Sequence, residues 1–402
     1  MAVDVRVPVF DERANLQGKP GLHVLIAGVS GYPNLPAPGD NSPGSPAAFG
    51  MRQLSSTTLT AYKICQWILA HKDSFPVPLA TCRVLLTPGA GELAAEPSLQ
   101  DFPRATVNNF LQAAKDWRSD AATSPDNMTL FYFAGHGIER SKGDAVLLLE
   151  EFGDGLGGAL RNCVDMYNIY TGMANAEGGG PIAQRQVYFV DACRNLPRAV
   201  PNFERESLGT TPAFNVTLAG EDKRSAPIFY AAAPGTTALA LPGQQTVFSM
   251  ALLQCLEGDA GVFEDVDGQD RWHVSVYSLS EALAVKIEDL NQALGGQQYY
   301  TPDGQQINKP ICFLDQAPTA EVVFEVDPFD ALSLARIEVL DNAGNTLVTI
   351  PWPLDPYPYR ARWTAGFCKI RATIQPPDPR YKDVQQDWML RPPRRPRKLR
   401  VT

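Results

Sequence analysis

The feature that most constrains the fold is an alternation of short apolar runs with longer amphipathic stretches, from the N-terminus to about residue 316. The runs expected to form buried strands are 23–29, 82–86, 128–134, 145–150, 186–190, 227–232 and 310–314. The stretches with helical spacing are 57–72, 106–117, 164–174, 247–256 and 279–290. Strands that alternate with helices are typical of a parallel sheet covered on both faces. The sequence therefore predicts a three-layer α/β/α sandwich with a mostly parallel central sheet.

From about Ala317 the pattern changes to short strands separated by turn residues, at 321–326, 335–340, 346–350 and 366–374. This pattern indicates a small β-sandwich. The proline-interrupted basic segment that follows is expected to be mobile. We therefore expect an N-terminal lead over residues 1–20, one domain over 21–316, a β-sandwich accessory domain over 317–390 and a basic tail over 391–402.

Composition and charge exclude several classes of protein. The chain has 44 acidic and 35 basic side chains, a net charge of −9, which argues against a protein built to hold nucleic acid. No run approaches the ~18 apolar residues of a spanning helix, and residues 1–20 lack the basic and apolar regions of a secretory signal. We therefore expect a cytoplasmic protein without nucleic-acid or membrane partners.

The seven cysteines are odd in number and widely scattered, and no CxxC pair occurs. This spacing favours neither a disulfide framework nor a zinc knuckle. Asp265, Asp267 and Asp270 resemble the start of a calcium loop, but Val276 stands at the twelfth position, where such a loop needs glutamate. We therefore expect no metal and no cofactor, and the question becomes which single cysteine is reactive.

Two of the predicted strands end in residues that carry chemistry. The strand ending at Ala134 is followed by Gly-His-Gly, and the strand ending at Val190 is followed by Asp-Ala-Cys-Arg. In open α/β sheets, reacting groups collect at the carboxyl ends of the strands. If the two strands are neighbours, His136 can relay a proton while the Cys193 thiolate attacks a carbonyl carbon.

Each residue taken alone has a simpler interpretation. A single histidine after a strand is more often a structural hydrogen-bonding group, and a single cysteine is usually a small apolar residue. The two together, each at a strand end and the histidine between glycines, favour catalysis.

The segments Tyr132–Gly137 (YFAGHG) and Val190–Arg194 (VDACR) resemble the two signatures of the caspase-like cysteine peptidases, which include caspases, metacaspases and bacterial relatives. Flanking segments at 23–29, 227–235 and 265–283 are similar to other parts of that fold, so the resemblance covers about Gly21 to Asp315. The resemblance implies that Cys193 is the nucleophile and His136 the general base and acid. It also implies that the N–H groups of Gly137 and Cys193 form the oxyanion hole, and that the substrates are proteins.

In this family the position of Asp191 lines the pocket for the residue before the cut. A buried carboxylate there would favour Arg or Lys. The alternative is an aspartate that only holds its loop by accepting backbone N–H bonds. The second pocket acid of metacaspases is missing from its usual place, where Ser55-Ser56-Thr57-Thr58 stand, and Asp40 is the substitute that we consider.

The irregular stretch after Cys193 corresponds to the region that many relatives cut during activation. It offers Arg198, Arg205, Lys223 and Arg224 as self-cleavage sites, with an uncut surface loop as the equal alternative. By analogy, the resemblance implies an effector of bacterial stress, cell death or anti-phage defence. A further hypothesis is that a small-molecule or protein activator acts through the C-terminal module. The competing hypothesis is a catalytically inactive caspase-fold scaffold protein that only binds partners.

Overall fold

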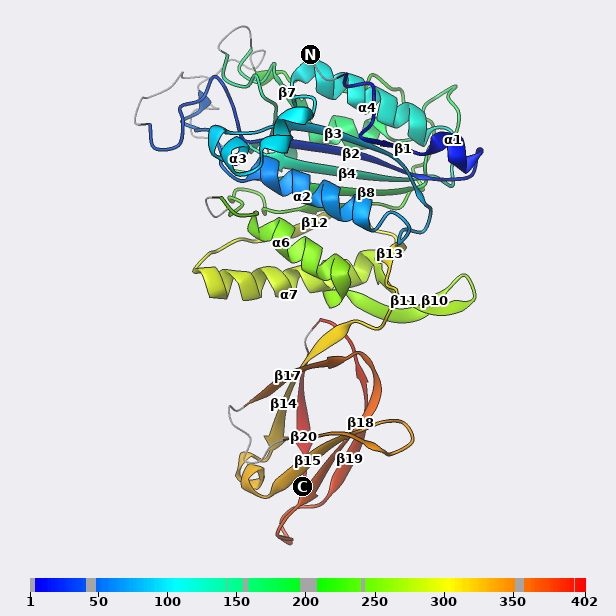
Figure 1. The fold of residues 1–402 in the computed structure, drawn as a ribbon, viewed down its shortest axis with the longest axis vertical. Coiled ribbons are helices and arrows are strands. Elements are labelled where there is room, and N and C mark those ends of the chain that lie inside the picture. Colours follow the sequence, from blue (N-terminus) through cyan, green and yellow to red (C-terminus); the bar gives the residue numbers. More distant parts are fainter. Residues whose placement is uncertain are drawn as a thin grey trace. The chain divides into compact units, whose positions relative to one another are not determined.

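The computed structural model describes residues 4–40, 48–141, 143–154, 158–195, 208–239, 243–350, 358–393 and 395–402 (Figure 1). Contacts within the chain divide it into two compact units, the first made of Met1–Leu253 and Lys286–Ile311 and the second of Gln254–Val285 and Cys312–Thr402. This division differs from the boundary expected at residue 316, because the segment Gln254–Val285 groups with the C-terminal module.

The first unit contains most of the expected strand–helix alternation. Its strands are β1 (Phe10–Asp11), β2 (Leu22–Val29), β3 (Leu79–Thr87), β4 (Met128–Gly135), β5 (Gly137–Ser141), β6 (Asp144–Leu148), β7 (Cys163–Asp165), β8 (Arg185–Ala192), β9 (Ala226–Tyr230) and β12 (Thr301–Gln305). Its helices are α1 (Arg13–Leu16), α2 (Thr57–Ala70), α3 (Ala90–Ala95), η2 (Pro97–Asp101), α4 (Val107–Ala121), α5 (Met166–Gly172) and α6 (Val247–Gln254). Helix α7 (Val276–Leu294) has residues in both units.

The central sheet has seven strands in the order β1-β3-β2-β4-β8-β9-β12. The five inner strands run parallel, whereas the edge strands β1 and β12 are antiparallel to their neighbours. Strands β2, β3 and β4 are buried along their whole length, which explains why they read as continuous apolar runs rather than as alternating ones.

Helices cover both faces of this sheet (Figure 1). On one face, α4 and α5 pack Phe110, Trp117 and Ile169 into the same core as Phe131 and Tyr188 of the strands. On the other face α2 approaches β2 so closely that a Cβ on Gly28 would lie 2.5 Å from the Cβ of Ala61. The expected α/β/α sandwich with a mostly parallel sheet is therefore confirmed.

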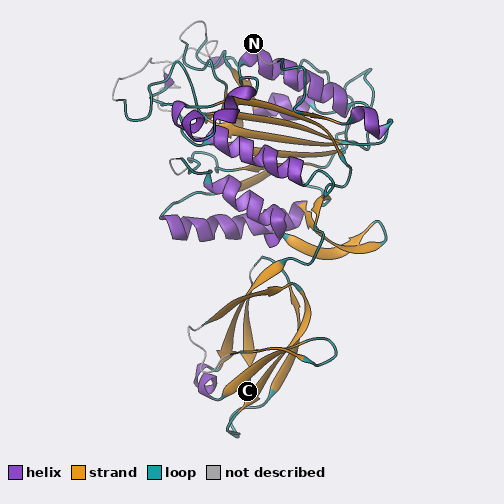
Figure 2. Cartoon of the chain, viewed as in Figure 1, coloured by secondary structure: helices purple, strands orange, loops and turns teal. Residues whose placement is uncertain are grey.

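The second unit is built mainly of strands (Figure 2). Its elements are η5 (Cys255–Asp259), β10 (Gly261–Val266), β11 (Gln269–Ser275), β13 (Pro310–Phe313), β14 (Thr319–Asp327), η6 (Phe329–Ser333), β15 (Ala335–Leu340), β16 (Thr346–Thr349), β17 (Tyr359–Thr364), β18 (Gly366–Ile374), β19 (Val384–Leu390) and β20 (Arg395–Arg400). Two sheets, β17-β14-β20 and β16-β15-β18-β19, share one apolar core that includes Phe324, Ile370 and Trp388. The expected C-terminal β-sandwich is present.

One segment differs from the sequence-based expectation. The basic tail, expected to be mobile, contributes β20, which pairs in parallel with β14 from Val322 to Asp327. The sequence of the tail did not predict this strand, because charged residues and prolines dominate it and apolar and polar residues do not alternate. The segment with Asp265, Asp267 and Asp270 forms the turn of the β10–β11 hairpin, where Asp265 Oδ1 accepts a hydrogen bond from Gly268 N at 3.1 Å.

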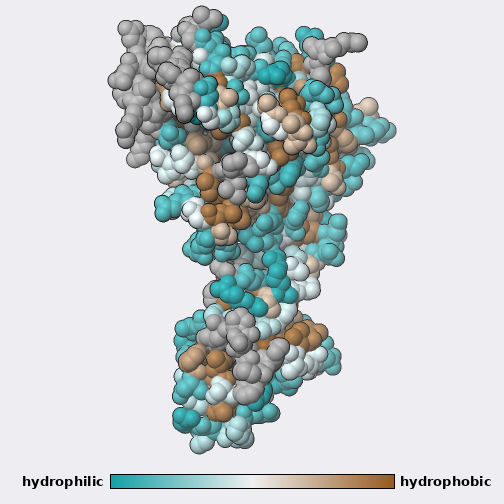
Figure 3. All heavy atoms as spheres, turned by 60° about the vertical axis from the view of Figure 1, so that its left-hand side comes forward, coloured by the Kyte–Doolittle hydropathy of each residue, from teal (hydrophilic) through white to brown (hydrophobic). Residues whose placement is uncertain are grey.

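On the face in Figure 3, apolar residues form separate small groups between hydrophilic ones. Among the described residues, no helix has the length and apolar character that crossing a bilayer requires.

Candidate active site

The sheet brings the two motif residues to adjacent strand ends. Strands β4 and β8 are parallel neighbours, and their register pairs Ala134 with Asp191 and Gly135 with Ala192. His136 directly follows the last residue of β4, and Cys193 directly follows the last residue of β8. Because neighbouring parallel strands lie about 4.8 Å apart, both residues leave the sheet at the same edge and at the same level. The expectation that these two strands are neighbours is confirmed.

The backbone and the ring of His136 are both held by the loop after β2. The backbone N–H of His136 donates to the Tyr32 hydroxyl at 2.8 Å, and the two rings lie 5.0 Å apart. The ring atom Nε2 lies 2.6 Å from the carbonyl oxygen of Arg52. A carbonyl oxygen only accepts, so Nε2 carries the proton, and in the neutral ring Nδ1 is left with a free lone pair. Burial lowers the pKa of His136 to about 4, which keeps this ring neutral near pH 7.

The Tyr32 hydroxyl occupies the place of an inter-strand hydrogen bond. Leu148 N donates to His136 O at 3.0 Å, as expected for a hydrogen-bonded antiparallel pair. The reciprocal bond is replaced, since His136 N–H donates to Tyr32 and the Tyr32 hydroxyl donates to Leu148 O at 3.0 Å. Tyr32 thus fixes the histidine from a position more than a hundred residues away in the chain.

In this ladder the N–H of Gly137 makes no hydrogen bond to β6. Gly137 pairs with Leu147, next to the hydrogen-bonded pair, so its N–H points away from β6. The N–H of Glu139 points to the same side and donates to Asn195 O at 3.1 Å. The N–H of Gly137 is therefore directed towards the chain that follows Cys193.

Close packing explains the glycines on both sides of the histidine. A Cβ on Gly137 would lie 2.6 Å from the carbonyl oxygen of Cys193, and one on Gly135 would lie 2.9 Å from the Tyr32 hydroxyl. Both distances are below van der Waals contact. Glycine is required here because the backbone after the histidine lies directly against the backbone that carries the thiol.

The thiol of Cys193 is partly buried and is covered by the segment after β9. Its Sγ accepts a hydrogen bond from Ala238 N at 3.3 Å. Burial raises the pKa of Cys193 above its ordinary value, and the Ala238 N–H opposes that shift. Within the described ranges, the imidazole of His136 bonds to Arg52 and the thiol of Cys193 to Ala238, and no hydrogen bond joins the two side chains. The resting pair is therefore a neutral thiol and a neutral imidazole.

These protonation states predict how Cys193 reacts with iodoacetamide. The thiolate is the nucleophile, so the alkylation rate should rise with pH and show no plateau below about pH 8. The measurement is the rate of mass increase in the Cys193 peptide, with the six buried cysteines as internal references and Cys193→Ala as the blank. A rate that stays constant down to about pH 6 would mean a preformed thiolate–imidazolium pair and would contradict this prediction.

Arg194 ties the chain after the thiol to the strand after the histidine. Its side chain is 2% exposed, forms an ion pair with Glu139 at 3.2 Å and lies 4.2 Å above the Tyr230 ring. Its backbone N–H donates to Thr236 O at 3.0 Å. Sequence reasoning noted Arg194 only as part of the motif. Its burial could not be foreseen, because both partners are distant in the chain.

Asp191 is 1% exposed and accepts hydrogen bonds from two hydroxyl groups. Tyr132 donates to its Oδ2 at 2.8 Å, and Thr246 donates to the same oxygen. Burial raises the pKa of Asp191 to about 6, although both hydrogen bonds oppose that shift. Asp40, the expected second acid, is exposed in the loop after β2 and makes none of the contacts of Asp191.

The stretch after Cys193 is tied to the first unit from Leu208 onward. Arg140 donates to Leu208 O, and Thr211 N donates to Cys163 O, both at 2.9 Å. Of the expected self-cleavage sites, Lys223 is exposed, whereas Arg224 is buried and ion-paired with Asp222. Burial makes the bond after Arg224 a poor site. Arg198 and Arg205 lie outside the described residues.

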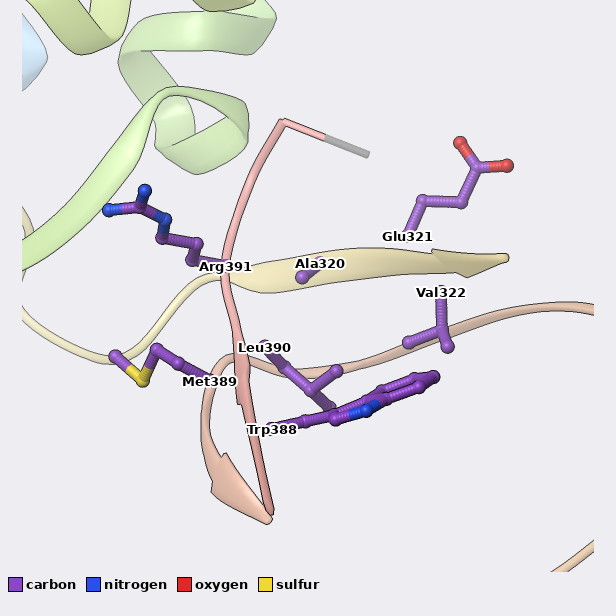
Figure 4. Close-up of a pocket in the computed structure, with 7 residues that line it drawn as sticks. All are labelled: Ala320, Glu321, Val322, Trp388, Met389, Leu390 and Arg391. Atoms are coloured by element: carbon purple, nitrogen blue, oxygen red, sulfur yellow. The ribbon is translucent and has the colours of Figure 1, made fainter. Parts of the chain in front are cut away.

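No three His, Cys, Asp or Glu side chains in the described part of the chain lie close enough together to hold a metal ion. The C-terminal unit contains a cavity of about 270 Å³ (Figure 4). Val322, Leu390 and the Trp388 ring form its apolar wall, and Glu321 and Arg391 project on separate sides. The expectation that this unit binds an activator stays a prediction, and this cavity is the place where such a ligand is expected.

Comparison with known proteins gives three results. The family model described as "Caspase domain" matches residues 78–298, more than half of the chain, and this range includes His136 and Cys193. The uncharacterized protein y4kE of Sinorhizobium fredii is 24% identical over 341 residues, 75% of this chain and 90% of that protein. Protein GSU0716 from Geobacter sulfurreducens has a similar solved structure, with 12% identity, 72% of this chain and 94% of that chain covered, and a TM-score of 0.39. Caspase-1 from Spodoptera frugiperda matches with 11% identity, 78% and 95% coverage, and a TM-score of 0.39.

Proposed function

The chain belongs to the caspase-domain family, and from this premise we propose that it is a cysteine endopeptidase that cuts proteins after Arg or Lys with a His136–Cys193 dyad. The observation that carries the proposal is the β4–β8 register, which puts the two residues at adjacent strand ends. A family match alone supports only a cysteine peptidase fold and protein substrates. The residue roles and the specificity rest on the contacts described above.

The mechanism begins with proton transfer from the Cys193 thiol to Nδ1 of His136. The resulting thiolate attacks the substrate carbonyl carbon, and the negative charge moves to the carbonyl oxygen. The N–H groups of Gly137 and Cys193 donate to that oxygen, and each such donor contributes about 3 kcal/mol in comparable sites. The C–N bond then breaks, and the leaving amine takes the proton from Nδ1. Water hydrolyses the thioester with His136 as the base and regenerates the thiol.

The lowered pKa of His136 and the raised pKa of Cys193 oppose the proton transfer in the resting site, so in the proposed mechanism the thiolate–imidazolium pair forms only transiently. A neutral imidazole with Nε2–H on the Arg52 carbonyl presents Nδ1 as the only basic atom of the ring. The Arg52 carbonyl also stabilises the imidazolium that forms when the thiol proton arrives. Tyr32 acts as a positioning residue, since it holds the backbone of His136.

Gly137→Ala tests the oxyanion hole. The added Cβ meets the Cys193 carbonyl oxygen at 2.6 Å, so the strand must move and carry the N–H of Gly137 away from the substrate. We expect kcat/KM to fall by roughly 10²-fold, the usual cost of one lost donor. Gly91→Ala is the matched control, because a Cβ there meets nothing within 4 Å. Equal activity of the two variants, with intact circular dichroism, would argue against this role for Gly137.

The proposal as a whole is tested by turnover of fluorogenic peptides ending in Arg, Lys or Asp, with the wild-type chain beside Cys193→Ala. We expect cleavage after Arg and Lys by the wild type only. If the two proteins behave alike, the chain is a scaffold and not a peptidase. The cytoplasmic location, the self-cleavage and the role in bacterial stress, cell death or anti-phage defence stay predictions drawn from the resemblance.

A further inference from the structure

The two carboxylate oxygens of Asp191 have very different surroundings. Oδ2 accepts hydrogen bonds from Tyr132 and Thr246, whereas Oδ1 is buried and has no hydrogen-bond partner among the residues that the structure describes. No ion pair involves Asp191 within the described ranges of the chain. A buried, unpaired carboxylate oxygen is costly, since carboxylates of this kind are normally paired or fully hydrogen-bonded.

The two hydroxyl groups have no spare proton for Oδ1. Each hydroxyl has one proton to donate. Thr246 Oγ1 accepts from Ser249 N at 3.2 Å at the start of α6, and its own proton goes to Oδ2. The Tyr132 hydroxyl donates its proton to Oδ2 at 2.8 Å. Neither hydroxyl group therefore supplies the donor for Oδ1, which leaves this position open to a donor of the substrate.

The position of Asp191 indicates where that donor comes from. Asp191 lies two residues before Cys193, and side chains two apart along a strand project from the same face. Thr246 ends the segment that begins after β9 and that touches Cys193 Sγ through Ala238. The segment that contacts the thiol therefore also donates a hydroxyl to Asp191, so Cys193 and Asp191 belong to one site.

We propose that Tyr132 and Thr246 are specificity-determining residues: they occupy Oδ2 of Asp191 and leave Oδ1 as the single acceptor for a substrate cation, so that the pocket does not discriminate Arg from Lys. This inference rests on the proposed function and deepens it. A guanidinium gains its advantage over an ammonium by binding both oxygens of a carboxylate with two parallel N–H groups. When one oxygen is already occupied by two hydroxyl donors, that advantage is lost.

Tyr132→Phe is the informative variant, because it removes one donor from Oδ2 and keeps the ring in place. Oδ2 then becomes available to a second N–H of the substrate, which an arginine offers in the right geometry and a lysine does not. We expect the wild-type kcat/KM values for Arg and Lys substrates to agree within about threefold. In Tyr132→Phe the ratio should shift towards Arg by roughly tenfold.

Tyr188→Phe is the matched control. Tyr188 is a buried tyrosine on the opposite face of the same sheet, and its hydroxyl donates to Gln186 at 2.5 Å, away from Asp191. Its Arg/Lys ratio should equal that of the wild type. Thr246→Ser, which keeps the hydroxyl, should also keep the wild-type ratio, whereas Thr246→Val should shift it in the same direction as Tyr132→Phe.

A second readout does not need turnover. Binding of Arg- and Lys-ended peptides to Cys193→Ala, with and without Tyr132→Phe, is measured by calorimetry. The same shift in the binding ratio would support the pocket. If the wild-type chain cut no peptide while this shift was present, the peptidase would be disproved and the pocket would stand. Cleavage by the wild type with an Arg/Lys ratio unchanged in Tyr132→Phe would overturn the pocket assignment and leave the peptidase intact. A variant in which both substrates lose activity equally, with a lowered melting temperature, would show that Tyr132 is only structural.

Discussion

Cys193→Ala is expected to abolish peptide cleavage, with a loss of kcat on the order of 10⁴- to 10⁶-fold. Alanine keeps the backbone N–H that donates to the oxyanion but offers no atom that can form the acyl intermediate. Residual turnover would come only from binding and the oxyanion donors. The measurement is single-turnover cleavage of an Arg-ended peptide, followed for hours.

The histidine should behave as part of the same unit. Adding His136→Ala to Cys193→Ala should lower the rate no further, because a base without a nucleophile contributes nothing. Cys368→Ala, in the C-terminal unit and far from the motif in sequence, is the control and should keep wild-type activity. Activity that survives in Cys193→Ala would assign the chemistry to another group.

Asp191→Asn is expected to lower the activity on basic substrates and to raise the stability of the chain. The first effect concerns specificity. The variant loses the negative charge that a substrate cation meets, so kcat/KM for Arg and Lys substrates should fall by roughly 10²- to 10³-fold. Neutral-ended peptides, poor substrates of the wild type, should be affected much less. Equal losses for all peptides would indicate that Asp191 only holds its loop.

The second effect of Asp191→Asn is a gain in stability near neutral pH. The pKa of Asp191 in the folded chain is about 6, above the ordinary 3.8. The folded chain therefore holds a proton that the unfolded chain has released between about pH 4 and pH 6, and the free energy of unfolding falls as the pH rises through that window. Asparagine cannot ionise. The variant should be more stable by roughly 1–3 kcal/mol at about pH 8 and show little gain at about pH 4.

Urea titrations of the two proteins at both pH values measure this effect. Thr129 is a suitable control position, because its hydroxyl is also buried without a partner but carries no charge. Thr129→Val should change the stability equally at both pH values. A gain in Asp191→Asn that does not depend on pH would show that the pKa of Asp191 in the folded chain is not raised above its ordinary value.

The sequence was sufficient to predict the sheet and its two functional strand ends. Buried parallel strands such as β4 and β8 appear as continuous apolar runs, and the residues that follow them must meet at one edge. The two motifs therefore indicated that His136 and Cys193 share one site if their strands are neighbours, and the β4–β8 pairing meets that condition. The strand that closes the β-sandwich, β20, was missed because its pairing depends on β14 and not on its own charged sequence.

The supporting contacts could not be predicted for a different reason. The Arg52 group that holds the imidazole is a backbone carbonyl, which any residue supplies. Tyr32 and Thr246 act through single hydroxyl groups from loops, where no periodicity marks a functional position. Asp40 was considered as a pocket acid only because it is acidic and lies in the loop before α2. Its exposed position shows that the sequence of a loop does not predict where a side chain points.

The loop contacts of the two reacting groups have a consequence for control. His136 is held by Tyr32 and Arg52, in the loop after β2, whereas the Cys193 thiol is held by Ala238, in the segment after β9. In the proposed mechanism, the sheet fixes the distance between the backbones of His136 and Cys193, whereas a different loop orients each side chain. A signal that reorients either loop can therefore change the rate without deforming the sheet, and the two loops provide independent points at which the reaction can be turned on or held off.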